Sequence, residues 1–416
     1  MTRVSAWMYL FYGTDIIQSK FDEAKDGSFE VLAPDKRYVF VSSSKHLREL
    51  DTAPDTVLSL QAASKQMLQP QYAMHSFNWF DRRGTEGVGF VRALRTLLTN
   101  NIPQILPNLS ILITSSLTDV LAEHPNVDAQ IGAVIQRFLS SHKAVYEVLL
   151  PIADQRCLQR DLGKLGGELP KHACIQWIME TSPRKAPWSG KRVVHELMAI
   201  WLGSVHALTT TITFAIRDLC LHPEYAEPLR AELEAEYKNF LQTGQGLPLL
   251  DSFIKESARL TPVESTLGPF QFSDGTKLSP GDWACTPVRA IMQNEALYPA
   301  PLEFHGFRFV DRDNVSIHTP EGAQRFQIQQ EKPSSLCSAD ATWHVWGSGR
   351  MVCPGRYYAA AVMKVILAQI IRDYDCSLVD PAARRWFTWR STTLPGPGTK
   401  VVFSPRQDVS RAVSGV

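Results

Sequence analysis

One long apolar segment between residues 189 and 222 constrains the fold more than any other feature. It reads SGKRVVHELMAIWLGSVHALTTTITFAIRDLCLH and contains no proline until Pro223, which cannot continue a helix. Its middle is apolar on all sides, and a helix of this kind is buried inside a protein. The sequence therefore predicts one long internal helix from about Ser189 to just before Pro223.

Shorter elements are predicted on both sides of this helix. Residues 37–41 fit a strand, and a serine-capped helix is expected after it. Further elements are helices over residues 89–102, 223–241 and 249–260, a hairpin around Asp274-Gly275 and strands within residues 384–405. We expect a mainly α chain with small β-sheets (α+β), organised as one domain over residues 1–416.

Composition argues against several classes of protein. The formal net charge of +1 gives no sign of a nucleic-acid-binding surface. The seven cysteines include no CxxC pair, and an odd number argues against a disulfide framework and for a reducing, intracellular compartment. No run of 18 apolar residues is present, so no membrane-spanning helix is predicted. We expect a monomer.

The segment around Cys353 carries the most specific chemistry. Pro354 suits the first turn of a helix, and the apolar run over residues 357–371 continues that helix. Cys353 is therefore expected at a helix N-terminus, where the dipole favours an anion by about 0.3–1 kcal/mol. This position predicts a lowered pKa for the thiol and a reactive thiolate.

The neighbours of Cys353 suggest what the thiolate binds. Gly347, Gly349 and Gly355 leave room for a large flat group, and Arg350 adds a cation. A thiolate with an open face suits an axial haem ligand. A catalytic cysteine would need a base, for which His344 is the only local candidate, and a phosphate loop would need a GxxxxGK[ST] pattern that is absent.

Three motifs together resemble the cytochrome P-450 family. WGSGRMVCPGR is similar to the haem-binding loop of that family, in which a Phe, a Gly, an Arg or His and the Cys recur, and Cys353 falls on the iron ligand. ESAR and PLEFHGFRF resemble two further motifs, which implies a buried charge cluster of Glu256, Arg259 and Arg308. Alone, Glu256 and Arg259 would be a surface pair worth about 0.2–0.5 kcal/mol.

The resemblance also gives the long helix a role, because this helix crosses the haem face opposite the cysteine in the family. Its middle usually carries an acid followed by a threonine, which relay protons. Here His206 stands at the acid position and Ala207 at the alcohol position, with three threonines from Thr209 to Thr211 further on. We assign His206 and Thr209 as catalytic candidates, and a buried histidine with only structural contacts is the alternative.

The chain also departs from the family pattern. No N-terminal membrane helix is found, the region of about residues 106–160 is shortened, and an arginine expected after TPVES is missing. Met351 replaces a common propionate-binding His or Arg, which leaves Arg350 and Arg95 to balance the haem propionates. A natural short member and an imperfect gene model both fit these departures.

The resemblance implies a haem-thiolate monooxygenase of the type found in fungal secondary metabolism. Its expected cofactor is haem b on Cys353, with electrons from NADPH through a reductase partner. The expected substrate is a hydrophobic terpenoid or polyketide, with pocket walls at the His206 turn and at residues 390–396. The family is anchored in the endoplasmic reticulum and faces the cytosol. The alternatives are a haem-thiolate isomerase or dehydratase, which the Ala207 departure suggests, and a degenerate, non-catalytic haem-binding protein.

Overall fold

A computed structural model describes residues 3–25, 27–54, 91, 93–123, 131–164, 174–262, 266–267, 272–279, 281–319, 326, 333–349 and 352–406. The helices are α1 (Arg3–Ala24), α2 (Ser44–Thr52), the π-helix η1 (Ala93–Leu98), α6 (Ile102–Glu123), α7 (Ile131–Asp161), α8 (Cys174–Glu180), α9 (Gly190–Leu221), the 3-10 turn η2 (Pro223–Tyr225), α10 (Ala226–Thr243), α11 (Pro248–Leu260), α12 (Val288–Met292), α13 (Arg312–His318) and α14 (Arg356–Asp373). The strands are β1 (Phe29–Leu32), β2 (Arg37–Phe40), β3 (Thr266–Leu267), β4 (Trp283–Cys285), β5 (Tyr374–Leu378), β6 (Trp386–Trp389), β7 (Thr392–Pro395) and β8 (Val401–Pro405).

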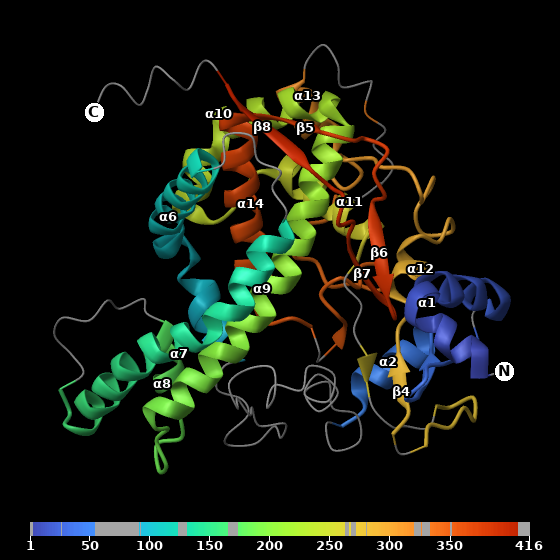
Figure 1. The fold of residues 1–416 in the computed structure, drawn as a ribbon, viewed down its shortest axis with the longest axis horizontal. Helices are drawn as coiled ribbons and strands as arrows, with labels where there is room; N and C mark the ends of the chain where they lie inside the picture. Colours follow the sequence, from blue (N-terminus) through green and yellow to red (C-terminus); the bar gives the residue numbers. More distant parts are fainter. Residues whose placement is uncertain are drawn as a thin grey trace.

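Helix α9 is the predicted long internal helix. The Ser189 side chain caps its N-terminus by accepting the Arg192 N–H at 3.4 Å, and the helix ends at Leu221, two residues before Pro223. Figure 1 shows α9 crossing the whole molecule, and it packs against α7, α11, α14 and β5. Within the described chain, α9 is long and apolar enough to cross a bilayer, and 35% of its most apolar stretch is buried against its neighbours.

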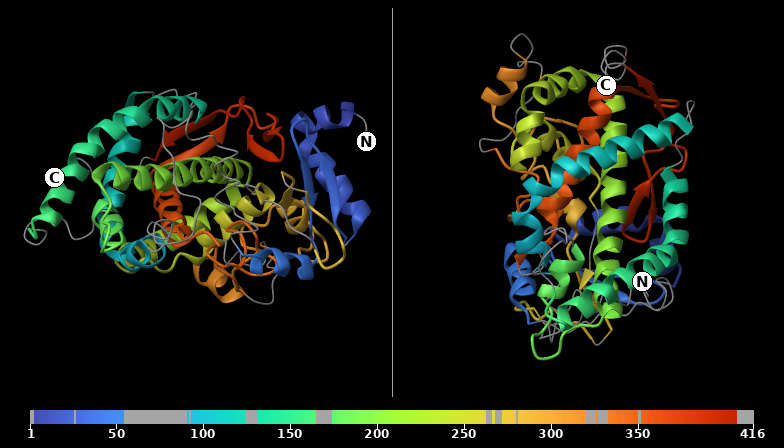
Figure 2. Two further views of the ribbon diagram at one scale, coloured as in Figure 1. Left: turned by 90° about the horizontal axis from the view of Figure 1, so that it is seen from below. Right: turned by 90° about the vertical axis from the view of Figure 1, so that its left-hand side faces the viewer.

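A four-stranded sheet lies at one end of the molecule with α1 packed against it. Its strand order is β1-β2-β4-β3, with β2 and β4 parallel and the other two pairs antiparallel. Figure 2 shows that this sheet with α1 and helix α7 lie at opposite ends of the molecule. Alternation along the strands buries Val31, Tyr38 and Phe40 beneath α1, which gives this end its own apolar core.

Two short antiparallel ladders close the C-terminal part, one of β5 with β8 and one of β6 with β7. The β6–β7 turn is held against the N-terminal part of the chain. Arg390 has a left-handed backbone (φ 57°), its N–H donates to the Leu10 carbonyl, and its side chain contacts Asp35 and Tyr38. This docking fixes the position of residues 390–396.

Most of the elements expected from sequence are confirmed. Strand β2 and helix α2, which Ser43 caps, lie where the pattern put them, and η2, α10 and α11 cover the two helical segments after Pro223. The predicted hairpin at Asp274-Gly275 is a tight turn with Gly275 at φ 86°, and β4 begins only at Trp283. The expected single domain over residues 1–416 stays a prediction.

Candidate functional site: a cysteine loop facing the long helix

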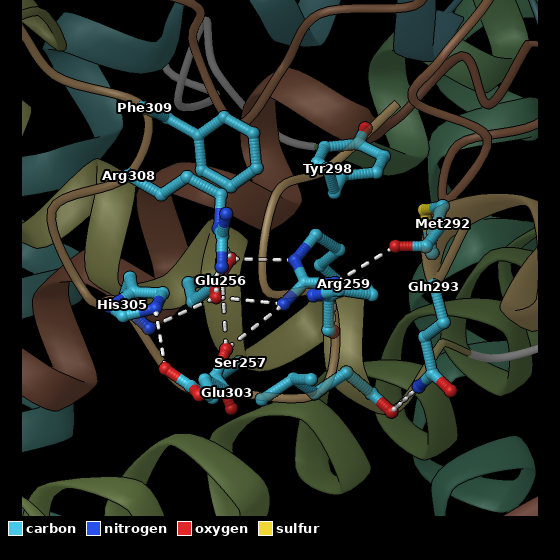
Figure 3. Close-up of polar contacts among 12 residues, drawn as sticks. Glu256, Ser257, Arg259, Met292, Gln293, Tyr298, Glu303, His305, Arg308 and Phe309 are labelled. Atoms are coloured by element: carbon cyan, nitrogen blue, oxygen red, sulfur yellow. Dashed lines mark hydrogen bonds and ion pairs between the residues drawn. The ribbon is translucent and has the colours of Figure 1, made fainter. Parts of the chain in front are cut away.

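A buried charge cluster underlies the core of the molecule. Glu256 and Arg259 come from one turn of α11, and Arg308 comes from the segment before α13; all three are fully buried. Arg259 reaches both Glu256 oxygens at 2.7 and 2.9 Å, and Nε of Arg308 lies 3.1 Å from each (Figure 3). The structure therefore brings together the three residues that the sequence motifs singled out.

The two arginines of this cluster also fix the chain around them. Arg259 donates to the Met292 and Pro301 carbonyls at 2.9 and 2.7 Å, and Arg308 donates to the Pro299 carbonyl at 2.7 Å. Burial lowers the pKa of Arg308, Glu256 raises it, and nearby Arg259 lowers it further. One carboxylate thus compensates two buried cations, which is tolerable because hydrogen bonds use their remaining donors.

Cys353 lies at the N-terminal end of α14, as expected. Its N–H donates to the Trp346 carbonyl at 2.8 Å, and its own carbonyl accepts from Arg356 at 3.2 Å. Gly355 is the N-cap residue of α14, and its N–H points at the Cys353 sulfur. The loop is thus closed by backbone contacts on both sides of the thiol.

The sequence predicted that this position lowers the pKa of the Cys353 thiol, and that prediction is wrong in sign. Burial raises the pKa of Cys353, and it outweighs the lowering by the Gly355 N–H and by Arg356. The helix N-terminus lowers the pKa of the thiol as expected. Desolvation raises the pKa by more, so the net effect is a higher pKa. Cys353 is therefore a partly buried thiol whose surroundings favour the neutral form.

The glycines of the loop have different roles from one another. Gly347 and Gly355 line an apolar cavity between this loop and α9, as expected for residues that leave space. Gly349 instead packs on α2, because a Cβ there would lie 2.5 Å from the Asp51 Cβ, and its φ is 52°. Ser348 donates to Asp51 at 2.7 Å beside it, so this glycine allows close contact between the loop and α2.

An apolar cavity of about 460 Å³ separates the cysteine loop from α9. Cys353, Pro354 and Gly355 lie in its wall on one side. The wall contributed by α9 consists of Ala199, Ile200, Gly203, Ser204, Ala207, Leu208 and Thr211. Leu94, Ala258, Thr261, Pro262, Thr286 and Val288 close the remaining sides. Its volume lies in the range typical of small-molecule sites.

The position of the α9 side chains departs from the expected assignment. Ala207 and Thr211 belong to the cavity wall, whereas His206 and Thr209 do not. Thr209 donates to the Val205 carbonyl at 2.7 Å and Thr211 to the Ala207 carbonyl at 3.0 Å. The helical period explains the difference, because residues 203, 207 and 211 share one face and Thr209 is rotated away from it. Burial lowers the pKa of His206.

The other expected site residues are placed as follows. Arg95 has an exposed side chain on η1 and is not part of the cavity wall, and Arg350 and Met351 lie outside the described residues. Residues 390–396 are likewise not in the wall, because Arg390 holds that turn against α1 and β2. His344 lines the cavity, but its Nε2 lies 2.9 Å from the Ala341 carbonyl and is not directed at Cys353.

A match to a known protein family covers most of the chain. The model of the cytochrome P450 family matches residues 66–400. The chain therefore belongs to the cytochrome P450 family, which confirms the resemblance seen in the sequence.

Individual relatives are similar over parts of the chain. The chain is 31% identical over 296 residues to the cytochrome P450 monooxygenase olcJ of Penicillium canescens, which covers 66% of this chain and 52% of olcJ. It is 31% identical over 227 residues to the ent-kaurene oxidase of Gibberella intermedia, which covers 51% and 41% respectively. The matches to olcJ and to the cytochrome P450 monooxygenase 151 of Postia placenta span about half the length of those relatives, whereas the match to ptmQ of Penicillium ochrochloron covers 90% of ptmQ at 22% identity.

A solved structure supports the fold alone. The retinoic acid bound cyanobacterial CYP120A1 superposes with a TM-score of 0.66 at 16% identity and covers 96% of this chain and 97% of its own. The mainly helical fold with small sheets is therefore that of a P450.

Haem is the cofactor of this family, and the observed cavity fits it in part. The thiol of Cys353, the Gly355 N–H beside it and the apolar wall are what an axial thiolate site requires. No arginine or lysine lines the cavity within the described chain, so that wall offers no cation for a propionate. Arg350 remains the candidate for this role from sequence.

Proposed function

We propose that the protein is a haem-thiolate monooxygenase that oxidises a hydrophobic small molecule by hydroxylation or epoxidation. The observation that carries this proposal is Cys353 facing the middle of α9 across an apolar cavity. A haem held by a cysteine thiolate supplies oxygen activation, because the thiolate pushes electron density toward the metal. The name of one fungal relative, ent-kaurene oxidase, supports a terpenoid substrate, and a polyketide from secondary metabolism is the alternative.

The residues of the chain have distinct roles in this proposal. Cys353 binds the metal, the Gly355 N–H stabilises its sulfur, and the apolar wall excludes water from the site. Ala207, Leu208 and Ile200 form the apolar surface for the substrate, and Thr211 supplies a hydroxyl on the same face. His206 and Thr209 remain proton-relay candidates that would have to act from behind this wall.

The test is the dependence of turnover on its co-substrates. Haem-loaded protein is incubated with a panel of terpenoid and polyketide hydrocarbons, an NADPH-dependent reductase and oxygen-18 gas. We expect a product that carries one oxygen-18 atom and that forms only when NADPH, reductase and oxygen are all present. A product that forms equally well without reductase and oxygen would contradict the proposal.

A second candidate function rests on Ala207. The family places an alcohol at this position of the long helix, and here the cavity wall carries a methyl group instead. This favours a haem-thiolate isomerase or dehydratase that does not activate oxygen, and turnover without reductase is the result it predicts.

The lack of a described cation in the cavity wall favours a non-catalytic haem protein, for which substrate binding without turnover is expected.

A further inference from the structure

The segment of residues 334–337, the hub, lies between the core helices and the cysteine loop and is bonded to both. Leu336 at its centre is fully buried, and side chains bind both of its backbone groups. Its N–H donates to Oδ2 of Asp251 at 2.5 Å. Its carbonyl accepts from two indoles, Nε1 of Trp343 at 3.2 Å and Nε1 of Trp346 at 2.5 Å. The two peptide groups that flank Leu336 are thus each held by a side chain and have little freedom to move.

Two buried cations fasten this hub to the core helices. Lys364 of α14 pairs with Asp251 at 2.5 Å, and both side chains are about one-tenth exposed. Lys255 of α11 is 1% exposed and donates to the Ser334 hydroxyl at 2.9 Å and to the Ser335 carbonyl at 3.0 Å. The hub is thus fixed to α11 and, through Asp251, to α14, the helix that follows Cys353.

Trp346 connects the hub to the cysteine. Its side chain donates to the Leu336 carbonyl, and its own carbonyl accepts the Cys353 N–H at 2.8 Å. Trp346 also lies in the cavity wall, and Gly347 next to it has a left-handed φ of 76°. Trp343 donates to the same carbonyl, but it is not part of the cavity wall and makes no bond to Cys353.

We propose that Trp346 is a positioning residue that fixes Cys353 by tying its loop to the Leu336 carbonyl. Phenylalanine, which the family commonly has at this position, could fill the same space but could not donate this hydrogen bond. Groups behind a metal ligand orient it, and their loss typically costs 10–100-fold in metal affinity. The effect of Trp346 on metal binding rests on the proposed haem-thiolate function. Its effect on the mobility of the cysteine loop does not.

The experiment compares Trp346→Phe with Trp343→Phe, which removes an indole N–H from the same acceptor. Amide hydrogen exchange of the peptide that contains Cys353 reports on the loop in the protein as purified. We expect exchange there to be about tenfold faster in Trp346→Phe and nearly unchanged in Trp343→Phe, because only Trp346 also holds the Cys353 N–H through its carbonyl. Replacement of Trp346 by benzothienylalanine, which keeps the shape and loses the N–H, should match Trp346→Phe.

The second readout is the state of the metal ligand. In the ferrous carbon monoxide complex, Trp346→Phe should convert from the thiolate form to the thiol form about tenfold faster than wild type, and Trp343→Phe should not. Equal exchange in all variants, or equal effects of the two substitutions, would overturn the positioning role. Wild-type protein that binds no haem would contradict the proposed function, and the exchange comparison would still decide the role of Trp346.

Discussion

Nε of Arg308 lies 3.1 Å from each carboxylate oxygen of Glu256, and neither side chain is exposed to solvent. The remaining nitrogens of Arg308 donate to the Pro299 and Ala300 carbonyls, at 2.7 and 3.3 Å. Glu256 therefore orders a long segment of chain as well as neutralising two arginines.

Glu256→Gln should therefore be strongly destabilising although its shape is preserved. It leaves Arg259 and Arg308 buried without a counter-ion, and breaking a buried ion pair costs about 3–5 kcal/mol. We expect a large loss in the free energy of unfolding, measured by urea denaturation. Glu303→Gln is the control, because Glu303 accepts these arginines through its carbonyl and has a mostly exposed side chain. Equal stability of wild type and Glu256→Gln would contradict this account.

Thr209 and Thr211 lie two residues apart on α9 and therefore on nearly opposite sides of the helix, with Thr211 in the cavity wall and Thr209 outside it. Thr211→Val should change substrate affinity or product formation severalfold, because Thr211 supplies a hydroxyl to the wall. Thr209→Val is a matched control, since both hydroxyls donate to the carbonyl four residues back. Binding titrations and product yield per NADPH consumed measure both effects. A larger effect of Thr209→Val would restore Thr209 as the functional hydroxyl.

Glu232 predicts a fall in stability as the pH rises. Burial raises the pKa of this fully buried carboxyl to about 7, although the Leu249 and Leu250 N–H groups and Lys364 lower it. The folded protein thus binds the proton more tightly than the unfolded chain, whose pKa is near 4.5. The stability that this proton contributes is present below about pH 4.5 and is lost as the pH rises to about 7.

Glu232→Gln should remove that pH dependence. Relative to wild type, the variant should gain on the order of 2–3 kcal/mol in the free energy of unfolding between pH 4.5 and 8. Glu234→Gln, at an exposed position on the same helix, should leave the wild-type profile unchanged. Denaturant titrations over this pH range measure the effect, and parallel profiles for Glu232→Gln and wild type would contradict the assignment.

The sequence predicted those parts of the molecule in which local pattern decides the structure. The ends of α9 follow from Ser189 and Pro223, and the position of Cys353 at a helix N-terminus follows from Pro354 and the apolar run after it. The cluster of Glu256, Arg259 and Arg308 was found through motifs, because no local rule brings residues 256 and 308 together.

Other features depend on packing that no local pattern reveals. The raised pKa of Cys353 reflects desolvation by the chain packed around this partly buried loop, which outweighs the local effect of the helix end. Residues 390–396 were predicted to line the pocket but do not. Arg390 binds Asp35 and the Leu10 carbonyl, which are distant in sequence, and so holds this turn elsewhere. The choice between Thr209 and Thr211 required the rotational phase of α9, which helical spacing could have supplied once one wall residue was known.

The most direct test of the central claim is the visible spectrum of the reduced, haem-loaded protein with and without carbon monoxide. It is recorded for wild type and for Cys353→Ser, with Cys337→Ser as a control for loss of a nearby thiol. We predict a strongly red-shifted Soret band in wild type and Cys337→Ser that is absent in Cys353→Ser. Folded wild-type protein without this band, or a band that survives Cys353→Ser, would contradict the assignment of Cys353 as the haem ligand.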